Sequence, residues 1–494
     1  MDWIVSLTPE VSDDPFAALA SPPDGASVVE LRLDLFPDLE IRSAISACPL
    51  PVLVTLRSCA EGGRGSDDPT ARAEILGAAR DAGAILIDLE HARDDRLINA
   101  LGLGPEQVVL SWHDPSGTPD DLERVAAQLL ESPARMVKLI PTAQTLADLE
   151  RVLSLHQRFN RSRPHNRRLL TFAMGTVGIA SRYLAPLLGP PLSFAAWRDG
   201  AAAAPGQLTV AQLEAVIGHL AGPPRRLFGV VGRDVSRSLS PALHCAGYRA
   251  LDLPDLFIPV SVPDETELIE VFTFLGDTLF DRIGLAAHGW AVTTPYKEIA
   301  ADAAEMVAPR VRRAFAANTL VLRETGMAAD NTDADGIVAS LVSLGIDACG
   351  RTAVVQGTGG AARGAAVGLY LAGAEVFLRG RDAEVTAEMA EILEISALEP
   401  GATPEGAEIL INATPLGSSP DDPLPFSDTE ITGAAAVVDM VYGVSETALV
   451  ARAAAAGIPT ADGKTVLAHQ AFAQFAAFTT KLPPKEAMMK AIGR

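Results

Sequence analysis

Short apolar runs alternate with stretches of helical periodicity throughout residues 1–220. The runs are rich in Val, Ile and Leu and only a few residues long, which is typical of strands buried in a parallel sheet. Eight of them occur, at residues 3–7, 28–35, 52–56, 84–89, 108–112, 136–140, 169–173 and 192–196. Eight strand–helix units in succession predict a (β/α)8 barrel.

Polar residues interrupt or end these runs near the carboxyl ends of the strands, where barrels hold their active sites. They are Glu30, Arg32, Arg57, Asp88, Glu90, His113 and Lys138. A lysine inside an apolar strand has its ammonium form destabilised, so Lys138 is expected to be a nucleophilic amine that can form a Schiff base. A lysine that pairs with a carboxylate, or that points outward between barrel and helices, is the alternative.

His113 follows the fifth run, and an imidazole there is suited to moving protons on a carbon next to an imine. Residues 111–114 fit a strand-end turn with a structural histidine equally well. Glu90 ends the neighbouring strand and is expected to hold the imidazole in one tautomer. Arg57 and Arg182 are expected to clamp a substrate carboxylate.

These residues resemble the type I 3-dehydroquinate dehydratase family over almost all of residues 1–220. The motifs that carry the resemblance are Glu-Leu-Arg-Leu-Asp at 30–34, Arg57-Ser58 with Glu61-Gly62-Gly63, Asp88-Leu89-Glu90, Ser111-x-His113-Asp114, Lys138, Ser181-Arg182 and Ala204-Pro205-Gly206-Gln207. The resemblance implies an imine on Lys138, acid–base work by His113, orientation by Glu90, and substrate binding by Ser6, Glu30, Arg32, Arg57, Arg182 and Gln207. The family usually has serine where Ala203 stands, so one substrate hydrogen bond is expected to be missing.

An Ala-Gly-Pro-Pro stretch at 221–224, followed by Arg225 and Arg226, predicts a short stiff linker, and residues 227–232 begin a new strand. Ser240 followed by Pro241 predicts the cap of a helix that begins at Ala242. Ser238 and the helix N-terminus also suit a carboxylate ligand, and the two roles are compatible.

Lys297 ends a Thr-Thr-Pro-Tyr-Lys turn at 293–297, where it is either a solvated first-turn lysine or one half of a catalytic pair. If the fold brings Asp333 beside it, the pair can move a proton during hydride transfer. The Asn-Thr-Asp-x-Asp-Gly stretch at 331–336 also fits a turn or a cation loop, but it lacks the downstream glutamate of a calcium-binding hand. No metal is expected.

Residues 352–356 predict a strand, and the glycine-rich loop at 357–361 predicts a turn whose amides approach a pyrophosphate. A second strand at 375–378 completes the context that this fingerprint requires. Arg379 and Arg381 stand where an NAD-binding fold offers an acid to the ribose, so the 2′-phosphate of NADP is expected there. Asp382 weakens this inference, and a basic exposed turn is the alternative.

Residues from about 226 to the C-terminus resemble shikimate dehydrogenase. The motifs are Ser238-Leu239-Ser240-Pro241 with His244, Val292-Thr293-Thr294-Pro295-Tyr296-Lys297, Asn318-Thr319, Asn331-Thr332-Asp333, the glycine loop, Asn412-Ala413-Thr414, Asp439-Met440-Val441-Tyr442, and Asp462-Gly463 with Gln470. The resemblance implies a catalytic pair of Lys297 and Asp333, and substrate contacts from Ser238, Ser240, Thr293, Asn318, Tyr442 and Gln470. It implies NADP contacts from Gly357, Thr358, Gly359, Gly360, Ala361, Arg379, Arg381, Met440 and Gly463. Ala291, Gly380 and Ala329 depart from the family, which often has Asn, Asn and Gly there.

The product of the first implied reaction is the substrate of the second, as in the fused enzymes of the shikimate pathway. The expected organisation is a dehydratase barrel at 1–222, a shikimate-binding catalytic lobe at 226–335, and a Rossmann NADP-binding lobe at 336–494 whose C-terminal helices return to the catalytic lobe. The expected activity is dehydration of 3-dehydroquinate to 3-dehydroshikimate, then reduction to shikimate with NADPH. Quinate turnover beside a weak dehydratase, and a metabolite sensor without catalysis, are the alternatives.

Composition limits the partners and the compartment. The 494 residues are 48% hydrophobic and carry a net charge of −22, which argues against nucleic acid and leaves small molecules as the expected partners. The four cysteines show no CxxC spacing, which fits thiols in a reducing cytoplasm. No long apolar stretch and no basic leader is present, so a cytoplasmic location is predicted. The oligomeric state stays open.

Overall fold

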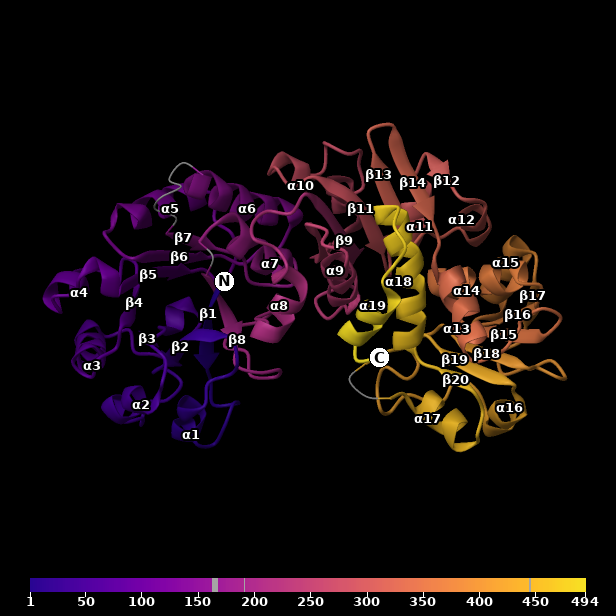
Figure 1. Cartoon of the computed structure of the whole chain (residues 1–494), viewed down its shortest axis with the longest axis horizontal. Helices are drawn as coiled ribbons and strands as arrows, with labels where there is room; N and C mark the ends of the chain where they lie inside the picture. Colours follow the sequence, from indigo (N-terminus) through magenta and orange to yellow (C-terminus); the bar gives the residue numbers. More distant parts are fainter. Residues whose placement is uncertain (162–167, 191, 444–445) are drawn as a thin grey trace.

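The computed structural model describes residues 1–161, 168–190, 192–443 and 446–494, and its three sheets follow one another along the longest axis of the molecule (Figure 1). The first sheet forms the barrel at one end, the second lies in the middle, and the third lies at the other end. This order confirms the predicted fold class, a barrel followed by a two-lobed region with a Rossmann lobe.

The barrel sheet has the order β7-β6-β5-β4-β3-β2-β1-β8, with every described pair of neighbours parallel. Successive side chains alternate between its two faces: Ile4 joins the apolar interior, whereas Trp3 and Val5 pack outward under the helices. Its strands are β1 (Asp2–Leu7), β2 (Ala26–Arg32), β3 (Val52–Thr55), β4 (Leu86–Glu90), β5 (Val108–His113), β6 (Met136–Ile140), β7 (Leu169–Thr171) and β8 (Leu192–Ala196).

Helices cover the outside of the barrel and connect its strands (Figure 1). Several begin where the sequence supplies a cap, as at Asp14, Asp68 and Thr209, whose side chains accept hydrogen bonds from first-turn amides. The helices are α1 (Pro15–Ala20), α2 (Ile41–Ala47), α3 (Pro69–Asp81), α4 (Asp95–Ala100), α5 (Leu122–Glu131), α6 (Leu146–Arg161), α7 (Ile179–Leu188) and α8 (Val210–Ile217), with short 3-10 turns η1 (Cys59–Glu61) and η2 (Pro105–Gln107).

The middle sheet has the mixed order β10-β9-β11-β13-β14-β12, in which β13 runs antiparallel to both of its neighbours, β11 and β14. Its strands are β9 (Arg226–Gly232), β10 (Asp255–Ser261), β11 (Ala287–Val292), β12 (Met306–Val307), β13 (Thr319–Arg323) and β14 (Gly326–Asp330). Between and after them come α9 (Ser240–Ala250), η3 (Glu265–Glu270), α10 (Leu279–Arg282), α11 (Lys297–Asp302), α12 (Pro309–Ala314) and α13 (Asp333–Ser343).

The third sheet is parallel and has the order β17-β16-β15-β18-β19-β20. Numbered from its own first strand this is 3-2-1-4-5-6, the order of a dinucleotide-binding fold. The strands are β15 (Thr352–Gln356), β16 (Glu375–Arg379), β17 (Ser396–Leu398), β18 (Ile409–Asn412), β19 (Ala436–Asp439) and β20 (Thr460–Ala461). The helices are α14 (Gly360–Leu371), α15 (Ala383–Leu393), α16 (Asp428–Gly433), α17 (Ala448–Ala455), α18 (Gly463–Thr479) and α19 (Lys485–Ala491).

One apolar core is shared by the barrel and the middle lobe. Buried side chains form a continuous cluster from Trp3 in the first strand to Ile492 near the C-terminus, and α7 and α8 of the barrel pack on β10 and α9. The helices α18 and α19 return from the third sheet to pack on α9, between the two sheets (Figure 1). The cores on the two faces of the third sheet are separate clusters.

The predicted strands occur, with ends shifted by a few residues. The strand predicted at 28–35 ends at Arg32, because the chain turns over residues 33–35, and the strand predicted at 169–173 ends at Thr171. The helix predicted to begin at Ala242 begins at Ser240, and no side-chain cap is described at its N-terminus. Ser240 therefore does not act as the predicted N-cap. The predicted boundary after Asp335 falls inside α13.

A carboxylate from the middle lobe receives the first amide of a barrel helix. The backbone N–H of Leu146, at the start of α6, donates to Glu267 Oε2 at 2.5 Å, and Arg282 pairs with Glu150 of the same helix at 2.8 Å. The segment just before α6 is tied to the loop that follows His113, since Thr142 Oγ1 donates to the Asp114 carbonyl at 2.8 Å. The middle lobe thus helps to fix a loop at the mouth of the barrel.

Replacing Glu267 by alanine removes this acceptor and is expected to loosen the start of α6. A lost helix cap costs about 1 kcal/mol, so backbone amides around residues 142–148 should exchange hydrogen roughly fivefold faster. Hydrogen exchange with mass spectrometry measures this directly. Glu265→Ala, an exposed acid of the same short helix, is the control, and equal exchange in the two variants would refute the contact.

Candidate active sites

The side chain of Lys138 lies in the interior of the barrel mouth. It projects from β6, is 6% exposed, and its Nζ lies 3.7 Å from the centre of the Phe194 ring and 3.9 Å from both Glu30 Oε1 and Asp88 Oδ2. Burial lowers the pKa of this amine, although the two carboxylates oppose the effect and Arg57 and Arg32 add to it. The side chain of Lys138 therefore does not point outward between the barrel and its helices. Lys138 does lie near two carboxylates, and its pKa is lowered all the same.

Glu30 connects Lys138 to the first strand and to the loop after β8. Its carboxylate accepts hydrogen bonds from Ser6 Oγ at 2.5 Å and Thr55 Oγ1 at 2.8 Å. Ser6 in turn accepts from Gln207 Nε2 at 3.2 Å, and Gln207 Oε1 accepts from the backbone of Ala203 at 2.7 Å. Burial opposes ionisation of Glu30, but Lys138, Arg32 and the two hydroxyls lower its pKa overall.

Arg57 is buried among three carboxylates. Its guanidinium donates to both oxygens of Asp88 at 3.0 Å, to Glu61 at 3.0 Å and to Glu90 at 3.1 Å, and also to Ser111 Oγ at 2.9 Å. These acids raise the pKa of Arg57 despite its burial. Since its donors are already engaged, Arg57 is poorly suited to the predicted clamp on a substrate carboxylate.

The ring of His113 is held by Glu61. Its Nδ1 lies 2.9 Å from Glu61 Oε2, and the His113 backbone N–H donates to the same oxygen at 3.1 Å. Burial, with Arg57 and Lys138 nearby, holds the pKa of His113 well below its ordinary value, so the ring is a neutral proton acceptor.

The expected partner of His113, Glu90, is engaged elsewhere. Its Oε1 accepts from the Ser58 backbone at 2.8 Å and from Arg57, and its Oε2 pairs with Arg93 at 3.0 Å. The prediction that Glu90 orients the imidazole is therefore wrong in this structure. The reason is the path of the chain after β3, where η1 brings Glu61 back over the barrel mouth.

Arg182 is buried on α7 beside the loop that follows β8. Its Nη2 donates to the Pro205 carbonyl at 3.0 Å and its guanidinium lies 4.7 Å from the centre of the Phe172 ring. Burial lowers the pKa of Arg182 to about 10, and a bound anion would relieve that desolvation. Arg32, by contrast, forms a two-pronged ion pair with Asp34 at 2.7 and 2.8 Å. Of the predicted cations, Arg182 best suits a carboxylate ligand.

Lys297 and Asp333 form the centre of a second site. Lys297 opens α11, Asp333 opens α13, and Nζ donates to Asp333 Oδ2 at 2.5 Å with both side chains buried. Asn318 Nδ2 donates to the other carboxylate oxygen at 2.9 Å. The fold therefore brings together the two residues whose pairing the sequence could only suppose, and the solvated-lysine alternative is excluded.

A hydrogen-bonded network fixes Asn318 behind this pair. Its Oδ1 accepts from the Thr332 backbone at 2.8 Å and from Thr319 Oγ1 at 2.8 Å. Gln470 Oε1 accepts from Asn318 Nδ2 at 3.3 Å and from Thr332 Oγ1 at 3.1 Å, and Gln474 donates to the Asn318 carbonyl at 2.9 Å. The amide of Asn318 is thereby oriented with its donor toward Asp333.

Other residues predicted for this site lie on loops and helix ends. Ser238 Oγ accepts from the Ser240 backbone at 3.2 Å at the start of α9, and Tyr442 lies in the segment after β19. Thr293 lies at the end of β11, where its backbone donates to the Val231 carbonyl at 2.8 Å.

The glycine loop packs directly against the lysine. A Cβ on Gly360 would lie 3.1 Å from Lys297 Cβ, and one on Gly364 would lie 2.8 Å from Asn331 Oδ1 and 3.0 Å from Asp333 Cβ. Small residues in the first turns of α14 therefore allow the cofactor loop and the Lys–Asp pair to share one site.

The loop has the shape of a nucleotide cradle. Gly357 adopts a φ of +125°, and a Cβ there would lie 2.9 Å from the Ala413 carbonyl. Gly359 precedes α14 without a side-chain cap, and no described atom lies within 4 Å of where its Cβ would be. The open space and the uncapped amides at Thr358 to Ala361 fit a pyrophosphate, as predicted.

Arg379, predicted to bind the cofactor, is buried and fully engaged. It donates to Gln356 at 2.5 Å, to Thr403 at 3.0 Å, to Glu430 at 2.7 Å and to two backbone carbonyls. Arg379 is therefore not available to the cofactor, contrary to the prediction, because the last residue of β16 faces the protein interior. Arg381 is exposed at the same turn.

Gly463 lies against the chain after β19, since a Cβ there would be 2.4 Å from the Val441 carbonyl and 2.8 Å from that of Met440.

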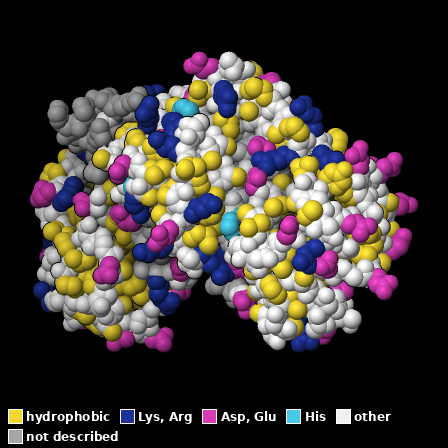
Figure 2. Space-filling view, turned by 45° about the vertical axis from the view of Figure 1, so that its right-hand side comes forward, with side chains coloured by type: hydrophobic (Ala, Val, Ile, Leu, Met, Phe, Trp, Pro, Cys, Tyr) yellow, Lys and Arg dark blue, Asp and Glu magenta, His cyan; other side chains and the backbone are white. Residues whose placement is uncertain are grey.

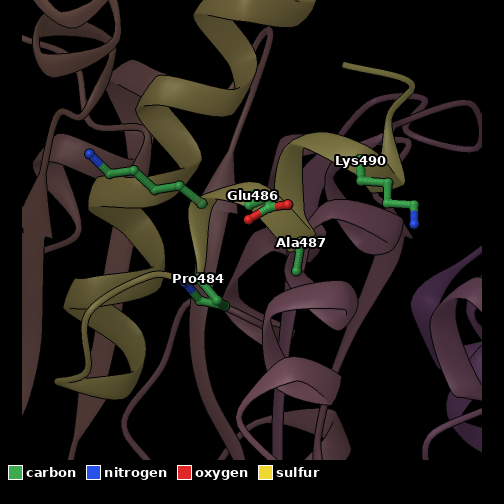
Figure 3. Close-up of a pocket in the computed structure, with 5 residues that line it drawn as sticks. Pro484, Glu486, Ala487 and Lys490 are labelled. Carbon is green, nitrogen blue, oxygen red and sulfur yellow. The ribbon is translucent and has the colours of Figure 1, made fainter.

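The surface away from these clusters is of mixed character. Asp and Glu side chains are scattered among Lys and Arg on the face seen in Figure 2. A shallow pocket beside α19 is lined by Pro484, Lys485, Glu486, Ala487 and Lys490 and belongs to neither cluster (Figure 3). Within the described parts of the chain, no helix has both the length and the apolar character needed to cross a membrane.

Several residues that complete the two sites have no role assigned from the sequence. Asp88 ends a strand and Glu61 precedes two glycines, but their partners depend on how loops fold back. Thr55 is a short polar residue on a strand and has no distinguishing pattern, and Ser111 stands in the motif at 111–114 without an assigned role. Gln474 lies one helical turn after Gln470 on α18, so its place on the same face was predictable from helix periodicity.

Comparison with known proteins gives matches to both halves. Residues 5–222 match the family described as Type I 3-dehydroquinase, and residues 230–320 match the Shikimate dehydrogenase substrate binding domain. The bifunctional 3-dehydroquinate dehydratase/shikimate dehydrogenase, chloroplastic, of Arabidopsis thaliana is 28% identical over 493 residues, covering 94% of this chain and 79% of that protein. Shikimate dehydrogenase (NADP(+)) of Citrifermentans bemidjiense is 33% identical over 281 residues, covering 54% of this chain and 94% of that protein. The solved structure of the dehydroquinate dehydratase and shikimate dehydrogenase from S. pombe AroM aligns with 100% of this chain and 98% of its own, at 22% identity and a TM-score of 0.45.

Glu61 is expected to make the stability of the barrel depend on pH. Burial, with Glu90 and Asp88 nearby, raises its pKa to about 8 against the opposing effect of Arg57. Between its ordinary pKa and about pH 8 the folded chain holds one more proton than the unfolded chain, so stability is lost as pH rises through about 8.

Glu61→Gln cannot titrate, so its free energy of unfolding should fall less than that of the wild type between pH 6 and pH 9. Urea unfolding at the two pH values measures the difference. Glu74→Gln, an exposed acid on α3, should keep the wild-type dependence. A Glu61→Gln variant with an unchanged pH dependence would exclude the raised pKa.

Proposed function

The chain belongs to the shikimate dehydrogenase family and carries a type I 3-dehydroquinase domain ahead of the dehydrogenase, and from this membership we propose that it catalyses two successive reactions. The barrel dehydrates 3-dehydroquinate to 3-dehydroshikimate. The second half reduces 3-dehydroshikimate to shikimate with NADPH, as the relative named shikimate dehydrogenase (NADP(+)) supports. The proposed location is a reducing cytoplasm, in which the four cysteines stay free thiols.

One observation carries the proposal. Each half of the chain presents a buried lysine amine at the edge of a sheet where its fold holds ligands, Lys138 in the barrel mouth and Lys297 against the glycine loop. A buried lysine is costly unless its amine is used or paired, and these two lie within polar networks built from several elements. A sensor without catalysis would not require either amine.

In the proposed dehydration, the amine of Lys138 attacks the C3 carbonyl of 3-dehydroquinate and water leaves, which forms an imine. The neutral ring of His113 removes a proton from C2 and returns it to the C1 hydroxyl, which departs as water. Glu61 holds the ring in place through its contact with Nδ1. Hydrolysis of the imine then releases 3-dehydroshikimate and the free amine.

Arg182 is the proposed partner of the substrate carboxylate, because its guanidinium is buried without a described ion pair. Arg57 is assigned a different role. It holds Asp88, Glu90 and Glu61 in place around the amine and the imidazole, and it keeps the barrel mouth from accumulating unpaired negative charge.

When bound, NADPH supplies a hydride to the C3 ketone of 3-dehydroshikimate. The amide groups of the glycine loop and Arg381 are the proposed holders of its phosphates. Lys297 donates a proton to the ketone oxygen, and Asp333 stabilises the ammonium form from which that proton comes. Ser238, Ser240, Thr293, Asn318, Tyr442 and Gln470 are the proposed substrate contacts.

Borohydride reduction in the presence of 3-dehydroquinate tests the imine. A stable adduct is expected on the peptide that contains Lys138, and Lys138→Met should give neither adduct nor dehydration while still reducing 3-dehydroshikimate. Lys297→Met should do the reverse, lowering the reductase kcat about 10²- to 10⁴-fold with the dehydratase intact. Each variant thus controls the folding of the other, and an adduct on Lys138→Met would disprove the assignment.

Ala203→Ser is expected to improve binding of 3-dehydroquinate. Ala203 belongs to the loop that Gln207 holds beside Ser6, and a serine there restores one hydroxyl near the proposed substrate. A neutral hydrogen bond is worth about 0.5–1.5 kcal/mol, so KM should fall about two- to tenfold. Ala202→Ser, on an exposed neighbour, is the control, and an unchanged KM in Ala203→Ser would contradict the prediction.

A further inference from the structure

Two arginines cross the boundary between the middle lobe and the Rossmann lobe, in opposite directions. Arg363 projects from α14 of the Rossmann lobe, and its Nη2 donates to Glu298 Oε1 on α11, directly after Lys297. Arg313 projects from α12 of the middle lobe, which packs on α14 and α15, and its Nη2 donates to the Leu393 carbonyl at 2.7 Å (Figure 1). Each lobe therefore supplies a cation to the other.

The guanidinium of Arg363 depends on Glu298 for the compensation of its charge. The side chain of Arg363 is 4% exposed, its Nη1 lies 3.6 Å from Met389 Sδ, and its Nε has no hydrogen bond to any described residue. A buried guanidinium loses its hydration and a thioether is a weak acceptor, so the carboxylate is its main partner. Exposed ion pairs usually contribute little, but here only Glu298 is exposed while the cation is buried. The pair therefore favours the arrangement in which α11 lies against α14.

The contact of Arg313 with the Rossmann lobe has three parts. Nε and Nη2 donate to the Leu393 carbonyl at 3.0 and 2.7 Å, and Nη2 pairs with Glu394 at 3.0 Å. The guanidinium also lies 3.8 Å from the centre of the Tyr370 ring, on α14. Leu393 is the last residue of α15, where carbonyls lack helical partners and a cation is favourable. One side chain of the middle lobe thus joins two helices of the Rossmann lobe.

The reactive lysine is in contact with both lobes close to these arginines. The helix α12 ends at Phe315, which adopts a φ of +48°, and the chain then turns back so that the Ala317 N–H donates to the Lys297 carbonyl at 2.7 Å. A Cβ on Gly360 would lie 3.1 Å from Lys297 Cβ and 3.4 Å from Ala316 Cβ. A small separation of α11 from α14 would therefore move the amine away from the glycine loop.

We propose that Glu298 and Arg313 are positioning residues for the reduction of 3-dehydroshikimate. The ion pair of Glu298 with Arg363 holds α11 against α14 and so fixes the amine of Lys297 beside the glycine loop. The contact of Arg313 with α15 joins a different pair of helices and limits rotation of the lobes about the first contact. The glycines of the loop permit this close approach, and the two arginines maintain it. The inference rests on the proposed dehydrogenase function and identifies what holds its reactive amine in position.

Glu298→Gln tests the ion pair at an exposed side chain, where the substitution leaves the fold intact. The kcat for reduction of 3-dehydroshikimate should fall about ten- to a hundredfold, since a displacement of about 1 Å at a reacting group has an effect of this size. KM should change little, because the proposed substrate contacts remain, and the dehydratase kcat should not change. Without substrate or cofactor, hydrogen exchange with mass spectrometry should show faster exchange in α11 and α14. Asp302→Asn, which changes an exposed acid on α11, is the matched control.

Arg313→Gln removes the second contact and should also lower the reductase kcat. Salt separates positioning from a general loss of structure, because an ionic strength of about 1 M screens the partly exposed pair. The wild-type kcat should then fall severalfold, while that of Glu298→Gln stays constant. The proposal is overturned if either variant keeps the wild-type kcat, or if the wild type shows no salt dependence. If the wild type does not reduce 3-dehydroshikimate with NADPH at all, the dehydrogenase function is removed, and the hydrogen-exchange difference still decides whether the ion pair joins the lobes.

Discussion

The guanidinium of Arg57 lies in the barrel mouth with hydrogen bonds to Asp88, Glu90 and Glu61, and the geometry of the first site depends on it. Without this cation, three buried carboxylates would repel one another, and breaking a buried ion pair typically costs about 3–5 kcal/mol. Glu61 in turn holds His113, and Asp88 lies beside Lys138. One side chain thus connects the proposed base, the proposed nucleophile and the strand ends that carry them.

The buried charges of the second site are compensated in a different way. Lys297 and Asp333 neutralise each other directly, and neutral amides and hydroxyls from Asn318, Thr332 and Gln470 orient them. What allows the cofactor loop to approach this pair is the absence of side chains at Gly360 and Gly364. The barrel site is therefore organised by electrostatics, and the dehydrogenase site by close packing.

Much of this was predictable from the sequence, because strands in parallel sheets have strong apolar patterns and their carboxyl ends share one edge. The barrel, the two strands on either side of the glycine loop and the polar residues at strand ends follow from these rules. The predictions that were wrong concern the hydrogen-bond partner of a side chain and the direction in which a side chain points. Glu90 was expected to hold His113, but η1 brings Glu61 there; Arg379 was expected at the cofactor, but the end of β16 turns it inward. One-dimensional patterns do not fix how a loop folds back or which way a strand-end side chain turns, so Arg379 and Arg381 could not be told apart.

The apolar core that runs from Trp3 to Ile492 joins the barrel and the middle lobe without a break. Because the two active sites belong to one chain and depend on one core, they are always present in equal amounts. They are made, folded and degraded together. A substitution in α7 or α9 that loosens this core lowers both steps at once, even though it touches neither site. Selection on either reaction therefore preserves the packing that supports the other, and the ratio of the two rates can change only through kcat and KM, never through the amount of enzyme.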